Sequence, residues 1–310
     1  MSLLSPLRYP GGKRRLATYV NDALRLNKVR PRLFVEPFAG GASVSLSLLA
    51  SGSVDGIVLG ERDPLVASFW KTAFFDTDWL VEAIRNVPIT LSQWKRFRAS
   101  PGQSVREQAL ACIFLNRTSF SGILAHSAGP IGGQKQTSCY SIGCRFNVEG
   151  IIRRIQDAAE FSPRVLSVHE GSWQETAAKV RRLGYRPDEV FFYLDPPFYD
   201  KADRLYRYYF RDQDHKLLHA WLTGLESRWL LSYDAADTMI SLYSSNGRGP
   251  RWIELLYSVA ASARLVQAKE LLVTNLPKLP RKTRLWASDE SLLSDSLSNR
   301  ADERSEVSCG

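Results

Sequence analysis

On both sides of a central stretch, the chain consists of short, mostly apolar runs. Segments in which apolar residues have helical spacing separate these runs. Seven of these runs have the length of strands: 33–36, 56–60, 165–168, 190–194, 228–232, 252–259 and 271–274. Uninterrupted apolar character is typical of strands that are buried on both faces of a parallel sheet. The last two runs predict an antiparallel hairpin at one sheet edge. The pattern therefore predicts an α/β fold with a seven-stranded, mostly parallel sheet.

The alternation of strand and helix breaks off between residues 66 and 147. Three segments in this stretch have helical spacing: 78–87, 91–98 and 105–115. A glycine- and serine-rich segment, 119–145, follows and is typical of a flexible polar loop or hairpin. We predict one domain formed by residues 1–65 and 148–286, with residues 66–147 as a mainly helical insertion.

Composition and charge narrow the class of protein. A hydrophobic content of 44% with 24% charged residues is typical of a soluble globular protein. The net charge is +9, but residues 287–310 carry −4, which leaves +13 on the rest. A body this basic favours a polyanionic partner; a merely soluble basic surface is the alternative. The end of the chain is rich in serine and charge and is predicted to be a disordered tail.

Neither a membrane span nor a secretion signal is evident. No apolar stretch approaches the roughly 18 residues that a membrane helix needs, and the apolar start of the chain is soon interrupted by Pro6. These features predict a cytoplasmic location.

The cysteines and histidines show no metal-binding spacing. The four cysteines form no C-x-x-C pair, which suits free thiols in a reducing compartment: Cys112, Cys139, Cys144 and Cys309. His126 with the two middle cysteines fits no common zinc pattern. His215 and His219 lie one helical turn apart without the glutamate of a metalloprotease helix, so we expect them on a helix surface.

A glycine loop after the first strand predicts a ligand site. Small residues around Gly40 and Gly41 let a ligand approach the backbone, and the loop is not the G-x-G-x-x-G of nicotinamide enzymes. Glu61 follows Gly40 by 21 residues, at the end of the second strand, and is placed to accept hydrogen bonds from the ribose hydroxyls of an adenosine. The alternative is a glycine pair that packs a helix, with Glu61 in solvent.

The segment Gly11-Gly12-Lys13 resembles a phosphate-binding loop only superficially. Leu7 stands where that loop needs its first glycine, and Arg14 replaces the serine or threonine that binds magnesium. The segment therefore argues against a kinase or an ATPase.

The run 190–194 ends abruptly at Asp195-Pro196-Pro197-Phe198. Prolines continue neither strand nor helix, so Asp195 stays at the strand's carboxyl end, where open α/β sheets bind ligands. An exocyclic ring amine is a poor nucleophile because its lone pair is conjugated. The Asp195 carboxylate and the Pro196 carbonyl can accept its two N–H groups, while Phe198 stacks on the ring, and no metal is needed. Simple strand termination is the alternative.

These motifs together carry a family resemblance. The segments 9–13, 35–43 and 194–198 with Glu61, in this order and with an insertion before the last of them, resemble the Dam-type DNA adenine-N6 methyltransferases. Further segments match at 114–117, 145–148 and 231–234. The likeness runs from about residue 7 to residue 276. It implies a Rossmann-like S-adenosylmethionine (AdoMet) methyltransferase fold whose insertion is the target-recognition domain.

The resemblance also implies roles for individual residues. The residues at the cofactor would be Tyr9, Gly12, Lys13, Phe38, Gly40, Gly41, Glu61, Ser172, Trp173 and Asp195. The residues at the DNA would be Arg8, Asn116, Arg117, Phe120, Ser121 and Lys135. A base inside a duplex is out of reach, so adenine would be flipped into the pocket. The setting would be a prokaryotic cell or a phage, and a cognate restriction endonuclease acting on the same site is a partner that the sequence leaves open.

Three positions depart from the family pattern. Phe198 replaces the usual tyrosine, and Ser172-Trp173 stands where Asp-Phe is common. Members that methylate GATC have an arginine, the commonest base reader, at the position of Ala125, so we do not predict GATC. The leading hypothesis is methylation of adenine N6 in double-stranded DNA. The alternatives are methylation of cytosine N4 or of RNA adenine, or a catalytically silent DNA-binding module.

Overall fold

A computed structural model provides the structure of the chain. It describes residues 5–8, 13–200, 202–244, 250–258 and 265–285. The predicted tail, 287–310, lies outside the described residues, as does Val259 at the end of one predicted strand. Within the described residues, no helix has both the length and the apolar character needed to cross a membrane.

The seven predicted strands form one sheet. The strands are β1 (Leu33–Glu36), β2 (Gly56–Glu61), β3 (Val165–Glu170), β4 (Val190–Leu194), β5 (Arg228–Asp234), β6 (Arg251–Ser258) and β7 (Leu265–Thr274). Their order is β3-β2-β1-β4-β5-β7-β6. The first five run parallel, whereas β7 pairs antiparallel with both β5 and β6. The predicted mostly parallel sheet and edge hairpin are therefore confirmed.

Helices cover both faces of the sheet. One face packs with α1 (Arg14–Leu26), α2 (Ser43–Ala50), α3 (Pro64–Phe75) and α7 (Val148–Ala159), and the other with α8 (Trp173–Arg182), α10 (Asp212–Thr223) and α11 (Asp237–Ser244). Alternation along the strands produces this division: Phe34 belongs to the first core, whereas Leu33 and Val35 belong to the second. Both faces are covered, as the apolar runs predicted.

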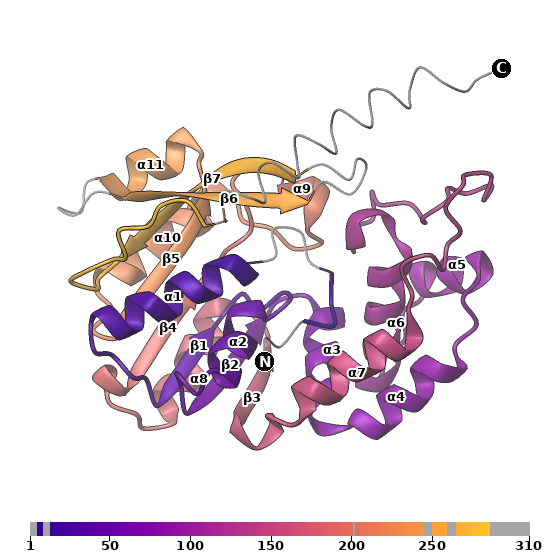
Figure 1. Ribbon diagram of the computed structural model, residues 1–310, viewed down its shortest axis with the longest axis horizontal. Coiled ribbons are helices and arrows are strands. Elements are labelled where there is room, and N and C mark those ends of the chain that lie inside the picture. The colour runs from indigo at the N-terminus through magenta and orange to yellow at the C-terminus, as the bar shows by residue number, and fades with distance from the viewer. Residues whose placement is uncertain (1–4, 9–12, 201, 245–249, 259–264, 286–310) are drawn as a thin grey trace.

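The predicted helices between the second and third strands are present. They are α4 (Thr77–Asn86), α5 (Leu91–Ala99) and α6 (Val105–Thr118), followed by the 3-10 turn η1 (Phe120–Gly122). Ser104 starts α6 with a capping box to Glu107. These helices lie beside the β3 edge of the sheet, to the right in Figure 1. Helix α3 packs against both α6 and β3, which joins this part to the sheet. The division into two domains itself stays a prediction.

Candidate active site

A pocket opens where β1, β2 and β4 end. Its lining includes Glu36 at the end of β1, Glu61 at the end of β2 and Asp195 directly after β4. The pocket has an empty volume of about 850 Å³, counted out to its open mouth. The strand order reverses between β1 and β4, and open α/β sheets bind ligands at such a switch point. The pocket is therefore in the right place for a nucleotide-like ligand.

Glu61 holds the glycine loop in place on one side of this pocket. Its carboxylate accepts hydrogen bonds from the Gly40 N–H (2.9 Å) and the Asp63 N–H (3.0 Å). The Trp70 indole donates to the Gly40 carbonyl at 2.8 Å, and Gly40 has a φ of 46°, in the left-handed region. Burial raises the pKa of Glu61 to about 7. Because Glu61 is buried, the alternative that placed its side chain in solvent is wrong.

Asp195 lies on the opposite side of the pocket and is held by two donors. The Ser232 hydroxyl, on β5, donates to Oδ1 at 2.9 Å, and the Lys13 ammonium lies 3.3 Å from the same oxygen. Ser232 is in turn 3.0 Å from the Tyr193 hydroxyl. Burial raises the pKa of Asp195, and the positive charge of Lys13 opposes that rise. The carboxylate is thus fixed in position and faces the same space as Glu61.

Lys13 also forms an ion pair with a residue that the sequence analysis missed. Its Nζ contacts the carboxylate of Glu270, which lies on β7 and is almost fully buried. Burial raises the pKa of Glu270 to about 7, again opposed by the charge of Lys13. The sequence did contain a signal for this ion pair, because Glu270 directly precedes the apolar run 271–274. An acid next to a buried strand is expected to have a charged partner, since a charge is rarely buried without one.

Phe198 lines the pocket, whereas the tyrosine after it does not. The Phe198 ring lies 5.6 Å from Lys13 Nζ and meets the Tyr206 ring edge-on, with centroids 6.0 Å apart. The Tyr199 hydroxyl donates to Asp212 at 3.1 Å, and its N–H donates to Asp234 at 2.8 Å. Tyr199 therefore anchors the loop and does not replace the hydroxyl that Phe198 lacks.

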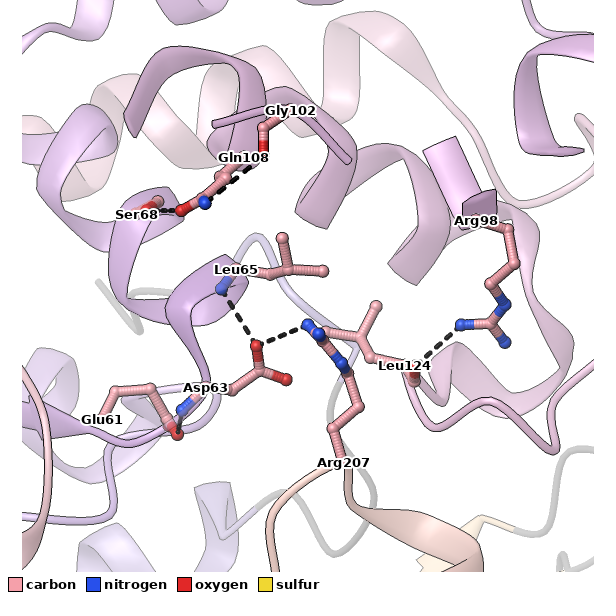
Figure 2. A network of polar contacts seen from close by, with 9 residues as sticks. All are labelled: Glu61, Asp63, Leu65, Ser68, Arg98, Gly102, Gln108, Leu124 and Arg207. Atoms are coloured by element: carbon pink, nitrogen blue, oxygen red, sulfur yellow. Dashed lines mark hydrogen bonds and ion pairs between the residues drawn. The ribbon is translucent and has the colours of Figure 1, made fainter. Parts of the chain in front are cut away.

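A segment after helix α9 (Ala202–Leu205) completes the pocket wall. Tyr206, Arg207, Tyr208 and Phe210 all line the pocket. Figure 2 shows the Arg207 guanidinium reaching Asp63, at 2.8 Å, while Asp63 also accepts the Leu65 N–H at the start of α3. Burial raises the pKa of Asp63, and Arg207 opposes that rise. This ion pair joins the segment to the end of β2, a contact that no motif indicated.

Several predicted cofactor residues are not brought to the pocket. Ser172 forms the capping box of α8 with Glu175, and the Trp173 ring packs on Trp221 with centroids 5.0 Å apart. Neither residue lines the pocket. Tyr9 and Gly12 lie outside the described residues. Lys13, Phe38, Gly40, Gly41, Glu61 and Asp195 do line the pocket together, as do Pro197 and Phe198, while Pro196 is buried beside them.

Asn116 and Arg117, both predicted at the DNA, have buried side chains on α6. Asn116 accepts the Arg8 N–H (2.7 Å) and donates to the carbonyls of Arg8 (2.6 Å) and Gly122 (2.9 Å). Arg117 donates to the Pro6 carbonyl. Burial and the charges of Arg154 and Arg8 lower the pKa of Arg117 to about 10. These contacts tie the start of the chain to the segment that follows α6.

The other predicted DNA residues are more accessible. Phe120 is 49% exposed, Lys135 is exposed, and Ser121 has a positive φ of 58° in the turn η1. Arg8 is half-buried, and burial together with the charge of Arg145 lowers its pKa. Arg145, at the end of the segment 119–145, therefore lies close enough to Arg8 for the two positive charges to interact.

Arg98, on α5, holds the middle of the segment 119–145. Its guanidinium donates to the carbonyls of Leu124 (2.7 Å), Ala125 (2.7 Å) and Ala128 (2.5 Å), and Figure 2 shows the first of these bonds. The Arg98 guanidinium also lies 5.2 Å from the Trp94 ring. The backbone around Ala125 is thus shaped by a side chain from a neighbouring helix.

His215 is buried against the sheet and is not on a helix surface, so that expectation is wrong. Its Nδ1 lies 2.7 Å from the Tyr233 hydroxyl on β5, and the His219 ring meets Tyr243 with centroids 4.9 Å apart. Burial lowers the pKa of His215. The apolar face of α10 includes both histidine positions, which the metal-spacing argument did not consider.

The strand order and the pocket at the switch point define a doubly wound α/β fold with its ligand site at the carboxyl ends of the strands. The chain belongs to the D12 class N6 adenine-specific DNA methyltransferase family, whose model matches residues 9–259. Among curated proteins, no match was found. The chain is therefore an enzyme that methylates the N6 amine of adenine in DNA, as the motifs predicted.

Proposed function

We propose that the chain transfers a methyl group from AdoMet to N6 of a flipped adenine in double-stranded DNA, in the pocket between Glu61 and Asp195. The observation that carries this proposal is that the two carboxylates, which follow different strands, line one pocket. One is suited to bind an adenosyl cofactor and the other to bind the amine that receives the methyl group.

The pocket residues fit AdoMet. Backbone N–H groups of Gly40, Asp63 and Arg62 hold the Glu61 carboxylate, and a carboxylate has about four lone pairs, so it retains acceptor capacity for the ribose. Gly40 and Gly41 bring backbone close to the ligand without side chains, and Phe38 offers a ring. When bound, AdoMet supplies an electrophilic methyl group on its sulfonium. Glu61, Lys13 and this loop would hold it.

Asp195 would bind and orient the target amine. Ser232 and Lys13 both contact Oδ1, so within the described residues Oδ2 is the oxygen left to accept an N–H. The Pro196 carbonyl would accept the second N–H, since the prolines fix its direction. With both N–H groups held, the nitrogen lone pair is directed away from the ring and toward the methyl group. Phe198 would stack on the base.

The DNA would lie over the segment 119–145 and the start of the chain. The charge of Arg145 contributes to the lowered pKa of Arg8, and a phosphate beside both would relieve their repulsion. Phe120, Ser121 and Lys135 are placed on the same segment, with Phe120 exposed for contact with bases. Asn116 would act from beneath by holding Arg8 and Gly122, and Arg117 by holding Pro6.

Methylation of defined duplexes tests this function. Purified protein is incubated with labelled AdoMet and with duplex DNA, single-stranded DNA or RNA of the same sequence, and the modified positions are mapped. We expect N6-methyladenine in the duplex at a recurring sequence. Methylation of cytosine N4, or of RNA alone, would contradict the proposal.

Cofactor affinity should depend on pH through Glu61. Its pKa of about 7 is raised by burial, so the carboxylate takes up a proton as the pH falls below 7 and then loses its strength as an acceptor. We expect the AdoMet Kd to rise about 10-fold between pH 8 and pH 6, because the ionised fraction falls from about 90% to about 10%. Calorimetric titration across this range measures the effect.

The Glu61→Gln variant is the control for this pH dependence. Its amide binds more weakly but does not titrate, so its Kd should vary much less between pH 6 and pH 8. An equally steep pH dependence in the variant would assign the effect to another group.

A further inference from the structure

We propose that Glu270 is a positioning residue for methyl transfer: it draws the Lys13 ammonium toward β7 and so keeps the Asp195 carboxylate a strong acceptor for the target amine. The inference rests on the role proposed above for Asp195. Glu270 itself is not among the residues that line the pocket.

Geometry places Glu270 behind the active-site carboxylate. Glu270 lies opposite Asp234 in the β5–β7 pairing, so its side chain starts two strands away from Asp195. Only 1% of Glu270 is exposed, and the side chain of Lys13 is 6% exposed. The Lys13 Nζ contact with Glu270 is closer than its 3.3 Å distance to Asp195. Lys13 thus sits between a carboxylate at the back and one at the pocket.

Asp195 and Glu270 compete for the positive charge of Lys13, and this competition affects the acceptor strength of Asp195. An ammonium that binds one carboxylate fully withdraws electron density from it and weakens its hydrogen bonds to other donors. Two carboxylates that share one ammonium, as Asp195 and Glu270 do, divide that effect between them. With Glu270 present, the pull of Lys13 on Asp195 is reduced, and the carboxylate keeps its strength for the amine N–H. With Glu270 neutral, the charge of Lys13 acts more strongly on Asp195.

Ser232 holds the Asp195 side chain in position independently of Glu270. The Ser232 hydroxyl donates to Asp195 Oδ1 at 2.9 Å and lies 3.0 Å from the Tyr193 hydroxyl. Neither of these two hydrogen bonds includes Glu270. Loss of the Glu270 charge should therefore leave Asp195 in place and change its acceptor strength. This distinguishes a positioning role in catalysis from a purely structural one.

The test is Glu270→Gln, assayed by single-turnover methyl transfer with AdoMet and duplex DNA. We expect the rate constant to fall about 10- to 100-fold, less than the loss typical for a group that touches the transition state, while the Kd values for AdoMet and DNA change less than threefold. Glu270→Asp should recover part of the rate. The matched control is Glu254→Gln on the neighbouring strand β6, whose partner Arg284 lies at the surface; it should retain the full rate.

A double-mutant comparison provides a second test, which applies even if the single variant Glu270→Gln fails to fold. In the Lys13→Met background, Glu270→Gln should lower the rate much less than is expected in the wild type, because Glu270 acts mainly through Lys13. A normal rate in folded Glu270→Gln would overturn the proposal, as would a loss of rate in the Lys13→Met background as large as that expected in the wild type. If Asp195→Ala also turned over normally, the proposed function would fail; if only Glu270→Gln did, this inference alone would fail.

Discussion

Asp195→Ala should abolish methyl transfer, with a loss in kcat of about 10³-fold or more, while duplex DNA is still bound. The carboxylate is the group that would hold the target amine, and removing one preorganised hydrogen-bonding group from an active site typically costs 10²–10³-fold. Loss of the amine's orientation adds to this. Single-turnover transfer of a labelled methyl group measures the rate, and fluorescence anisotropy with labelled duplex measures binding.

Asp188→Ala is a suitable control for this change. Asp188 precedes β4, as Asp195 follows it, but its side chain is 73% exposed in a surface pair with Arg186. The control should keep normal turnover. Normal turnover in Asp195→Ala itself would remove Asp195 from the catalytic role, whatever happens to DNA binding.

Asn116→Ala should lower the free energy of unfolding by about 3 kcal/mol and weaken DNA binding. The fully buried amide makes three hydrogen bonds, to the N–H and carbonyl of Arg8 and to the carbonyl of Gly122. Buried polar groups left without partners cost about 1–3 kcal/mol each. Arg8 and the turn at Gly122 would both lose their support, so DNA affinity falls although Asn116 itself is covered. Urea unfolding and anisotropy measure the two effects.

Asn86→Ala provides the comparison at an exposed position of helix α4. Among the described residues, the Asn86 amide bonds to Glu82 alone, on its own helix α4, and the change should stay within about 0.5 kcal/mol of the wild type. If Asn116→Ala lost DNA affinity while keeping full stability, Asn116 would contact DNA directly, and the supporting role inferred from its burial would be wrong.

Tyr199 does not supply the hydroxyl that is missing at Phe198. The tyrosine that follows it gives its hydroxyl to Asp212 and its N–H to Asp234, so it holds the loop after the two prolines. The pocket therefore presents an aromatic ring without a hydroxyl at this position. Stacking requires only the face of the ring, which phenylalanine and tyrosine share.

Where the structure shows contacts that the sequence analysis did not expect, these are side-chain contacts. Asn116, Arg117 and His215 have polar side chains, and a sequence gives no sign of whether such a group meets solvent, DNA or a buried partner. Ser172 and Trp173 follow a strand end, as site residues do, but they cap a helix and pack on Trp221. Apart from the local cap of Ser172 with Glu175, these roles involve residues from other elements of the fold.

The sequence by itself determined the sheet, the edge hairpin and the positions of Glu61 and Asp195 at strand ends. It could do so because apolar runs, glycine loops and prolines act on the local backbone, and parallel strands bring their carboxyl ends to one edge. Only the tertiary structure decided that Glu270 meets Lys13, that Arg207 meets Asp63 and that Asn116 holds Arg8. These contacts join residues more than a hundred positions apart, and nothing local in the chain specifies them.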